Sequence, residues 1–160
     1  MELRPLVDGD LGDVLALNQS EVPNVGPLTS DGLVALVARC DLALVASDED
    51  GIAGMLLALA PGTDYGSPNY RFFEQRGTDH LYVDRVAVAA RARRRGLASA
   101  LYDQVERHAR ASGRAEVTCE VNVQPPNDAS LRFHAARGFV EVGQQQVGDH
   151  RVSLLAKPLR

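Results

Sequence analysis

The sequence has little cysteine and no long apolar segment. Its two cysteines, Cys40 and Cys119, are far apart, and no cluster of Cys and His residues has the spacing of a metal site. We therefore expect free thiols, no disulfide framework and no metal. No apolar run reaches the roughly 20 residues that a membrane span needs, and the start of the chain lacks the pattern of a secretory signal. The expected location is the cytoplasm, without contact to a membrane.

An excess of positive charge is also absent. The chain of 160 residues carries 17 Lys and Arg against 21 Asp and Glu, a net charge of −4, which disfavours broad affinity for nucleic acid. Lys157 is the only lysine, and such a preference for arginine is typical of a GC-rich bacterial genome. Four arginines nevertheless lie within one short segment: Arg91, Arg93, Arg94 and Arg95. Length and composition predict one globular domain over residues 1–160, with a single sharply basic spot.

Hydrophobic periodicity divides the chain into short alternating elements. Helices are predicted at Asp8–Ser20, from Thr29 or Ser30 through Val37, after Gly96 as far as Gly113, and from Asn127 or Asp128 to Arg137. Strands are predicted at Leu42–Ser47, Ile52–Ala60, His80–Ala89, Glu116–Val123, Phe139–Gln146 and His150–Leu155. The segment Pro61–Asn69 contains too many Pro and Gly residues for a regular element and is predicted to be a loop. This order indicates a mixed α/β domain with antiparallel strands at both ends.

The basic turn, residues 93–99, lies where a predicted strand ends and a predicted helix begins. Free backbone N–H groups and the positive end of the helix dipole meet at such a point, which favours an anion. Arginines there oppose the dipole by about 0.3–1 kcal/mol each, so the cluster is unfavourable without an anion. Gly96 and Ala98 are small enough to let the backbone approach a pyrophosphate. A solvated helix start is the alternative interpretation.

Two motifs of the sequence resemble those of the GCN5-related N-acetyltransferases (GNAT). The first is the strand from Tyr82 to Val88 followed by Arg93-x-x-Gly96-x-Ala98, which is similar to the acetyl-CoA signature of that family. The second is the segment from Asn127 to His134, ending in Gly138-Phe139, which resembles the family's later helix. The run Tyr82-Val83-Asp84-Arg85 also resembles a subgroup of predicted acetyltransferases with undefined acceptors. The resemblance implies a GNAT-like acyl-CoA N-acyltransferase fold, with a central mixed, mostly antiparallel sheet flanked by helices.

The resemblance also implies a site for acetyl-CoA as cosubstrate in a gap between the fourth and fifth strands. Backbone groups of Val86 and Val88 would bind the pantetheine, and the backbone N–H at Val86 or its neighbour would hold the oxyanion. The pyrophosphate would lie on the basic turn. The predicted cofactor-binding residues are Val86, Ala87, Val88, Arg93, Arg94, Arg95, Gly96, Leu97, Ala98, Ser99, Asn127 and His134.

Two residues are candidates for proton transfer. An amine must be neutral to attack a thioester, and an alkylamine with a pKa near 10.4 is about one part in 2,500 neutral at pH 7, so a base is useful. Glu120 matches the position of the catalytic Glu in some family members; its alternative role is a rim carboxylate that faces solvent or pairs with Arg85. His134 stands where relatives place a Tyr that protonates the thiolate. A packed helix histidine without proton transfer is the alternative there.

Four further residues are predicted to bind the acceptor: Asp84, Asn122, Tyr70 and Tyr82. We place Asp84 on the same strand face as Tyr82, Val86 and Val88, because side chains alternate along a strand. Asp84 either binds a cationic acceptor or forms a salt bridge with a nearby arginine. The aromatic residues around Tyr70 either shape the acceptor pocket or form a small hydrophobic cluster under the loop.

The predicted function is transfer of acetyl from acetyl-CoA to a primary amine of a small molecule or peptide, by direct attack in a ternary complex. A covalent route through Cys119 is disfavoured because this thiol is predicted on the strand face opposite Glu120. The alternative function is a non-catalytic module that senses CoA with the same site. A nucleic-acid binder that uses the arginines is disfavoured by the net charge. A homodimer through the terminal strands remains open.

Overall fold

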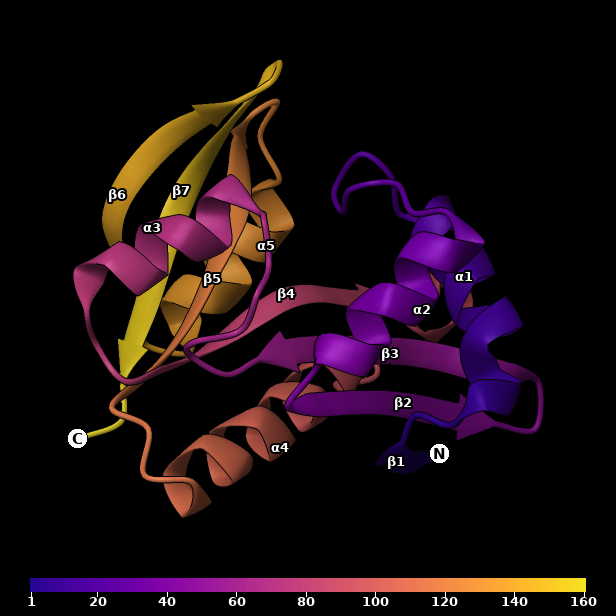
Figure 1. The fold of residues 1–160 in the computed structure, drawn as a ribbon. Coiled ribbons are helices and arrows are strands. Elements are labelled where there is room, and N and C mark those ends of the chain that lie inside the picture. Colours follow the sequence, from indigo (N-terminus) through magenta and orange to yellow (C-terminus); the bar gives the residue numbers. More distant parts are fainter.

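The computed structural model describes residues 1–160, which form a seven-stranded sheet flanked by five α-helices (Figure 1). The strand order is β1-β2-β3-β4-β5-β7-β6; β4 and β5 are parallel, and the other neighbours are antiparallel. The strands are β1 (Glu2–Pro5), β2 (Leu42–Asp48), β3 (Gly51–Leu59), β4 (His80–Val88), β5 (Glu116–Gln124), β6 (Val140–Val147) and β7 (His150–Pro158). The helices are α1 (Leu11–Ser20), α2 (Ser30–Arg39), α3 (Pro68–Arg76), α4 (Leu97–Ala111) and α5 (Asp128–Ala136). The predicted fold class is confirmed.

Local capping signals define the helix ends well. The Thr29 side chain accepts a hydrogen bond from Gly32 N and begins α2, and Asn127 does the same for α5 through Ser130 N. Both caps were among the predicted ones, because Thr and Asn oxygens satisfy N–H groups that the first turn leaves free. The antiparallel strands predicted at both ends of the domain are also confirmed, as the hairpins β2–β3 and β6–β7.

Two elements escape sequence analysis. Strand β1 has four residues and ends at Pro5, so it is too short for a periodic signal. Helix α3 begins at Pro68, inside the segment predicted to be a loop, with Ser67 as its N-cap. Proline is tolerated in the first turn of a helix, where its missing N–H has no partner to lose. The prolines and glycines before α3 therefore form the loop, whereas Pro68 and Asn69 belong to the helix.

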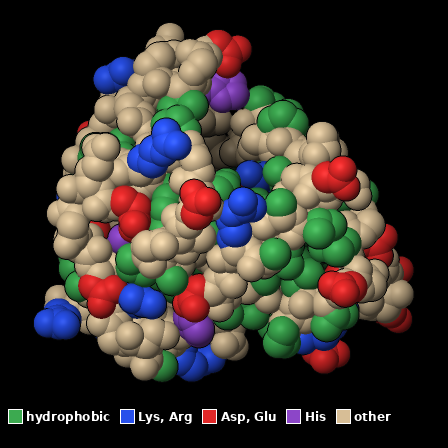
Figure 2. Space-filling view, in the orientation of Figure 1, with side chains coloured by type: hydrophobic (Ala, Val, Ile, Leu, Met, Phe, Trp, Pro, Cys, Tyr) green, Lys and Arg blue, Asp and Glu red, His purple; other side chains and the backbone are tan.

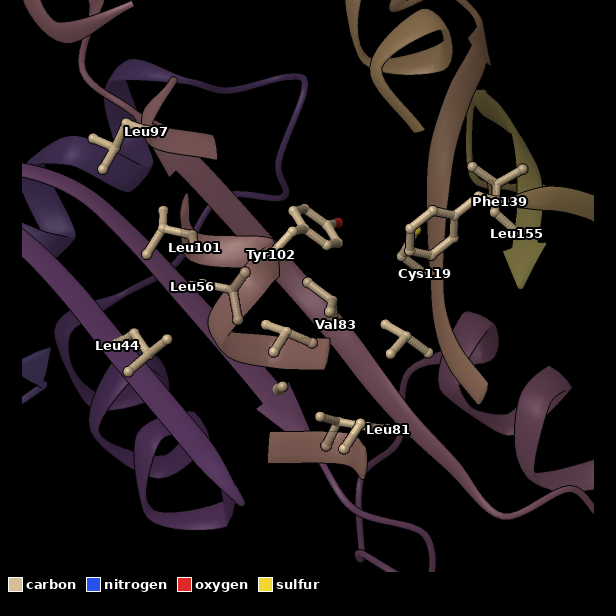
Figure 3. Packing of buried hydrophobic residues seen from close by; sticks show 14 of the residues in the cluster. Leu44, Leu56, Leu81, Val83, Leu97, Leu101, Tyr102, Cys119, Phe139 and Leu155 are labelled. Atoms are coloured by element: carbon tan, nitrogen blue, oxygen red, sulfur yellow. The ribbon is translucent and has the colours of Figure 1, made fainter. Parts of the chain in front are cut away.

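The sheet separates two hydrophobic layers. On one face, α1, α2 and α3 pack residues such as Leu17, Leu36 and Phe73 against β3, β4 and β7. On the other face, Leu97, Leu101 and Tyr102 of α4 pack against Leu56, Val83, Cys119 and Phe139 (Figure 3). We call these the α1–α3 face and the α4 face. No helix is long and apolar enough to cross a membrane.

The strands β4 and β5 pair only at their first residues. The register runs from His80↔Glu116 to Tyr82↔Thr118 and then ends, although both strands continue. In Figure 1 the two strands diverge beyond this point, so that β1–β4 and β5–β7 form two halves of the sheet. The divergence opens a gap through the middle of the sheet.

A β-bulge at Asp84 corrects the predicted strand faces. Opposite β3, Leu57 pairs with Arg85 and Ala58 pairs with Val83, so Asp84 is an extra residue. Beyond the bulge the alternation is shifted: Tyr82 belongs to the α1–α3 face, whereas Val86 and Val88 pack on the α4 face. The prediction that Asp84 shares a face with Tyr82, Val86 and Val88 is therefore wrong for the two valines. One extra residue reverses every side chain that follows it.

Candidate functional site

The gap between β4 and β5 is the mouth of a cleft of about 840 Å³. Figure 2 shows it as a hollow between the two halves of the molecule. Its walls come from the α1–α2 loop (21–27), the second half of β4, the start of α4, and from β5, α5 and β7. Ten of the predicted site residues line it: Asp84, Val86, Ala87, Val88, Arg93, Ala98, Glu120, Asn122, Asn127 and His134.

The backbone of the basic turn leaves a row of donors free. None of the N–H groups from Arg94 to Ser99 donates to a protein acceptor. Arg94 has φ 64° and Gly96 has φ 74°, and left-handed residues in a turn can direct successive N–H groups toward one point. Glycine adopts this conformation without strain, which explains Gly96. This arrangement can hold an anion at the N-terminus of α4.

The side chains of the basic turn are arranged less regularly. The Arg93 guanidinium donates to both carboxylate oxygens of Glu21, at 2.6 and 2.7 Å, across the cleft. Arg95 lies 3.9 Å from Asp48 at the surface, and Leu97 is packed in the core of the α4 face. Arg94, Arg95, Gly96, Leu97 and Ser99 do not line the cleft itself; their free N–H groups lie next to it, between the lining residues Arg93 and Ala98 and the first turn of α4.

Backbone groups of β4 also face the gap. Ala89 N donates to Ala53 O, so Ala89 and Ala53 form a hydrogen-bonded antiparallel pair. Such pairs alternate along the ladder, which assigns Ala87 to the next one and leaves Val86 and Val88 between them. The N–H and C=O groups of Val86 and Val88 therefore point away from β3, toward the side where β5 has diverged. An extended, amide-bearing chain can pair with them as an additional strand would.

Glu120 is the carboxylate at the centre of the cleft. Its two oxygens accept hydrogen bonds of 2.8 Å from the Tyr82 hydroxyl, and no cation pairs with it. Burial, together with the negative charge of Asp84, raises the pKa of Glu120 from 4.5 to about 8, against the lowering effect of the Tyr82 hydrogen bond. The alternative pairing of Glu120 with Arg85 is not present. Tyr82 is fully buried and contacts this carboxylate instead of lining the cleft.

Asp84 and Arg85 form an ion pair beside Glu120. The Arg85 Nε donates to Asp84 Oδ2 at 2.8 Å, and the Tyr65 hydroxyl donates to Asp84 Oδ1 at 2.7 Å. The remaining Arg85 contacts are to Asn18 Oδ1 and Gly26 O, at 2.9 and 3.0 Å. The bulge makes this pair possible, because it brings two consecutive side chains to one face. The salt bridge that was one of the two predicted roles of Asp84 is present.

His134 lies in the wall of the cleft with both ring nitrogens engaged. Nδ1 is 2.7 Å from Ser130 O, and Nε2 is 2.7 Å from the Tyr102 hydroxyl. A carbonyl only accepts, so Nδ1 carries the proton and Nε2 accepts from Tyr102. Burial, with a smaller contribution from the Arg137 charge, lowers the pKa of His134. The imidazole is therefore neutral near pH 7, with no N–H directed into the cleft.

Of the remaining residues predicted to bind the acceptor, Asn122 lines the cleft and Tyr70 does not. The Asn122 amide lines the cleft and donates to Pro23 O at 3.3 Å, which connects β5 to the α1–α2 loop. Tyr70 is buried in the α1–α3 layer, and its hydroxyl donates to Ala60 O at 2.6 Å, outside the cleft. Of the aromatic residues near the loop, Tyr65 is the one that lines the cleft.

Sequence analysis did not assign the partners of these residues. Tyr102 and the 21–27 loop lie outside the two motifs and Arg85 lies within the first of them, but the contacts of all three depend on tertiary packing. Tyr102 carries the one available signal, since it is a hydroxyl-bearing residue at an apolar position of the helix after the basic turn.

Comparison with known proteins identifies one family and several solved structures of similar fold. Residues 23–139 match the sequence model of the acetyltransferase (GNAT) family. No curated protein matches the chain. Among solved structures, Naa20 of Chaetomium thermophilum in complex with a bisubstrate analogue has a TM-score of 0.80 at 22% identity, over 99% of this chain and 86% of that one. Ard1 from Thermoplasma volcanium gives 0.79 at 19% identity, over 98% and 96% of the two chains.

A third similar structure is the ribosomal-protein-S18-alanine N-acetyltransferase from Escherichia coli. Its TM-score is 0.76 at 16% identity, over 99% of this chain and 93% of that one. At such identities these likenesses show a common fold.

Proposed function

The chain belongs to the GNAT acetyltransferase family, and we propose on that basis that it transfers acetyl from acetyl-CoA to a primary amine, by direct attack in a ternary complex. The observation that carries this proposal is the meeting of two features in one cleft. The free N–H groups of residues 94–99 lie at the N-terminus of α4, beside Arg93 and Ala98, which line the cleft, and the carboxylate of Glu120, which no cation pairs with, lines the same cleft from β5.

The cofactor side fits the chemistry of CoA. Acetyl-CoA, when bound, supplies an acetyl group activated as a thioester. The N–H groups of residues 94–99 suit its pyrophosphate, and the gap-facing polar groups of Val86 and Val88 suit the amides of pantetheine. Arg93 lies at the same end, where its guanidinium pairs with Glu21. A backbone N–H that faces the gap, such as that of Val86, is the proposed donor to the oxyanion.

Glu120 is the proposed general base. Proton transfer from an ammonium with a pKa near 10.4 to an ordinary carboxylate is uphill by about 8 kcal/mol. The pKa of about 8 at Glu120 reduces this to about 3 kcal/mol, which a catalytic step tolerates. Tyr82 positions the carboxylate through its hydroxyl, whereas burial and, to a lesser degree, the charge of Asp84 keep the pKa of the carboxylate high.

The proposed acid role of His134 requires a change at the ring. A neutral imidazole that donates to Ser130 O and accepts from Tyr102 has no proton to give to a thiolate in the cleft. Donation would need protonation of Nε2 and loss of the Tyr102 contact. His134 as acid therefore stays a prediction, tested below.

Two measurements on the purified protein test the function. Isothermal titration measures binding of acetyl-CoA, and thiol release with mass spectrometry of the products measures transfer to a panel of primary amines. We expect saturable binding and amine-dependent thiol release. Binding without consumption by any amine would instead support the CoA-sensing module, and absence of binding would contradict both functions.

A further inference from the structure

The charges around Glu120 restrict what the acceptor can be. Resting on the proposed function, we propose that the acceptor is a monoamine: one primary ammonium on a body that is otherwise uncharged and mainly apolar. Amines with a second cationic group, and amino acids with a nearby carboxylate, are then poor substrates.

The carboxylates of the cleft provide a place for one cation only. Three of them line it: Glu21, Asp84 and Glu120. Glu21 is held by Arg93, at 2.6 and 2.7 Å, and Asp84 by Arg85, at 2.8 Å, and also by the Tyr65 hydroxyl. Glu120 is the one that no cation neutralises. A second ammonium in the cleft would have to lose its water without a carboxylate to replace it, which is unfavourable.

The cations of the cleft are equally engaged. The Arg85 guanidinium donates to Asp84, to Asn18 and to the carbonyl of Gly26, and it is largely buried by these contacts. Arg93 lies at the cofactor end, on Glu21. Another basic side chain of the cleft is His150 on β7, whose Nε2 lies 3.4 Å from Asp149 Oδ1. A carboxylate on the acceptor would therefore find neither guanidinium free to pair with it, and it would be repelled by Glu120 in its ionised form.

The wall beyond these charges is apolar. It is formed by the α1–α2 loop and the β6–β7 hairpin, and its apolar residues are Val22, Pro23, Val25, Pro27, Val147 and Val152. Two carbonyls of this wall are satisfied internally, since Pro23 O accepts from Asn122 and Gly26 O from Arg85, and, besides Glu21, Asn24 and His150 are the polar side chains of the loop and the hairpin that line it. Such a surface gains free energy by covering hydrocarbon.

Three amines with the same four-methylene chain test the proposal: pentylamine, 1,4-diaminobutane and 5-aminopentanoate. Only the far group changes, from methyl to ammonium to carboxylate. With saturating acetyl-CoA, we expect kcat/KM for pentylamine to exceed that of each charged amine by at least about tenfold, since an unpaired charge in the cleft is costly. Equal or better use of the diamine or the amino acid would overturn the monoamine proposal and leave the acetyltransferase function intact. Binding of acetyl-CoA with no transfer to any primary amine would overturn the function itself.

A charge-altering variant sharpens the result. Asn122 lies two residues beyond Glu120 on the same strand face, at a distance of about 7 Å along the strand, close to the span of 1,4-diaminobutane. Asn122→Asp adds a second carboxylate without changing side-chain size. We expect the pentylamine preference over 1,4-diaminobutane to fall by about tenfold, as expected for one new ion pair in a partly buried site. The matched control is Gln146→Glu, which adds the same charge on β6 outside the cleft and should leave the ratio unchanged. An unchanged ratio in Asn122→Asp would contradict the proposal.

Discussion

The two sides of the cleft are built in different ways. The cofactor side consists mainly of backbone groups from one continuous stretch, the second half of β4 and the turn into α4. The acceptor side consists of side chains from segments far apart in the sequence, with Glu120 from β5 held by Tyr82 from β4, and Arg85 held by Asn18 from α1. The cofactor side should therefore tolerate side-chain changes that keep the backbone path, whereas the acceptor side should fail when one side chain is lost.

The largest effect is expected on the acceptor side. Glu120→Gln keeps the size of the side chain and removes the base, so we expect the rate of acetyl transfer to fall about 10²–10³-fold, the usual contribution of general base catalysis. Affinity for acetyl-CoA, measured by titration, should stay within about twofold, because the cofactor side is untouched.

Glu116→Gln is the matched control. Glu116 lies on the same face of the same strand but pairs with Arg76 at 3.1 Å, at the end of β5 away from the cleft. Its transfer rate should be close to that of the unaltered protein. A similar loss in both variants would indicate a structural defect and contradict the role of Glu120.

The second effect tests the cofactor side. Gly96→Glu places an L-residue at φ 74° and a negative charge at the basic turn, so we expect acetyl-CoA to bind about a hundredfold more weakly. Gly113→Glu, at the other end of α4, has nearly the same φ of 75° and the same open surroundings. It carries the same backbone strain and charge, and it should bind acetyl-CoA normally. Equal loss of affinity in the two variants would rule out the turn as the anion site.

The third effect is the pH dependence of transfer. Because the pKa of Glu120 is about 8, its base form is rare below that pH, and kcat/KM should rise about tenfold per pH unit up to pH 8. Between pH 8 and the amine pKa near 10.4 the profile should be flat, since the amine loses its cationic form only above that value. In Glu120→Gln the rate should instead rise throughout with the neutral amine. A continuous rise in the unaltered protein would exclude Glu120 as the base.

The raised pKa of Glu120 also makes the free energy of unfolding depend on pH. The folded-state pKa of Glu120 is raised above its ordinary value of 4.5, so its contribution to folding is present below about pH 4.5 and is lost as the pH rises through about 8. The unaltered protein should lose Tm between pH 6 and pH 9 relative to Glu120→Gln, which carries no charge at this position.

The contrast between the two sides also explains what the sequence could predict. The caps at Thr29 and Asn127, the strand before the basic turn and the helix after it follow from local chemistry, and all are confirmed. The candidate cofactor side was found because its geometry is local as well. The family resemblance supplied the ligand that we propose for it, acetyl-CoA, which the residues alone did not predict.

Long-range contacts limited the prediction of the acceptor side. The bulge at Asp84 depends on the register between β3 and β4, and no local pattern marks it. It reversed the faces expected for Val86 and Val88 and brought Arg85 beside Asp84. Tyr70 was expected in the acceptor pocket, but it lies in α3 and its hydroxyl donates to Ala60 O in the core. The expectation was wrong because α3 was not predicted.

The smallest effect on the transfer rate is expected at His134, which lies on α5 in the wall of the cleft. His134→Gln keeps a polar group near Tyr102 and should lower kcat by less than about fivefold, because a neutral ring with both nitrogens engaged does not donate to a thiolate. Tyr102→Phe is the companion variant, since it removes the hydroxyl and leaves the imidazole, whose Nε2 is then free to take up a proton. If His134 is the acid after all, His134→Gln would lose about a hundredfold in kcat, whereas Tyr102→Phe would retain most of the activity. Equal, small losses in the two variants would instead assign the pair to holding α5 against α4, which keeps the cleft wall in place.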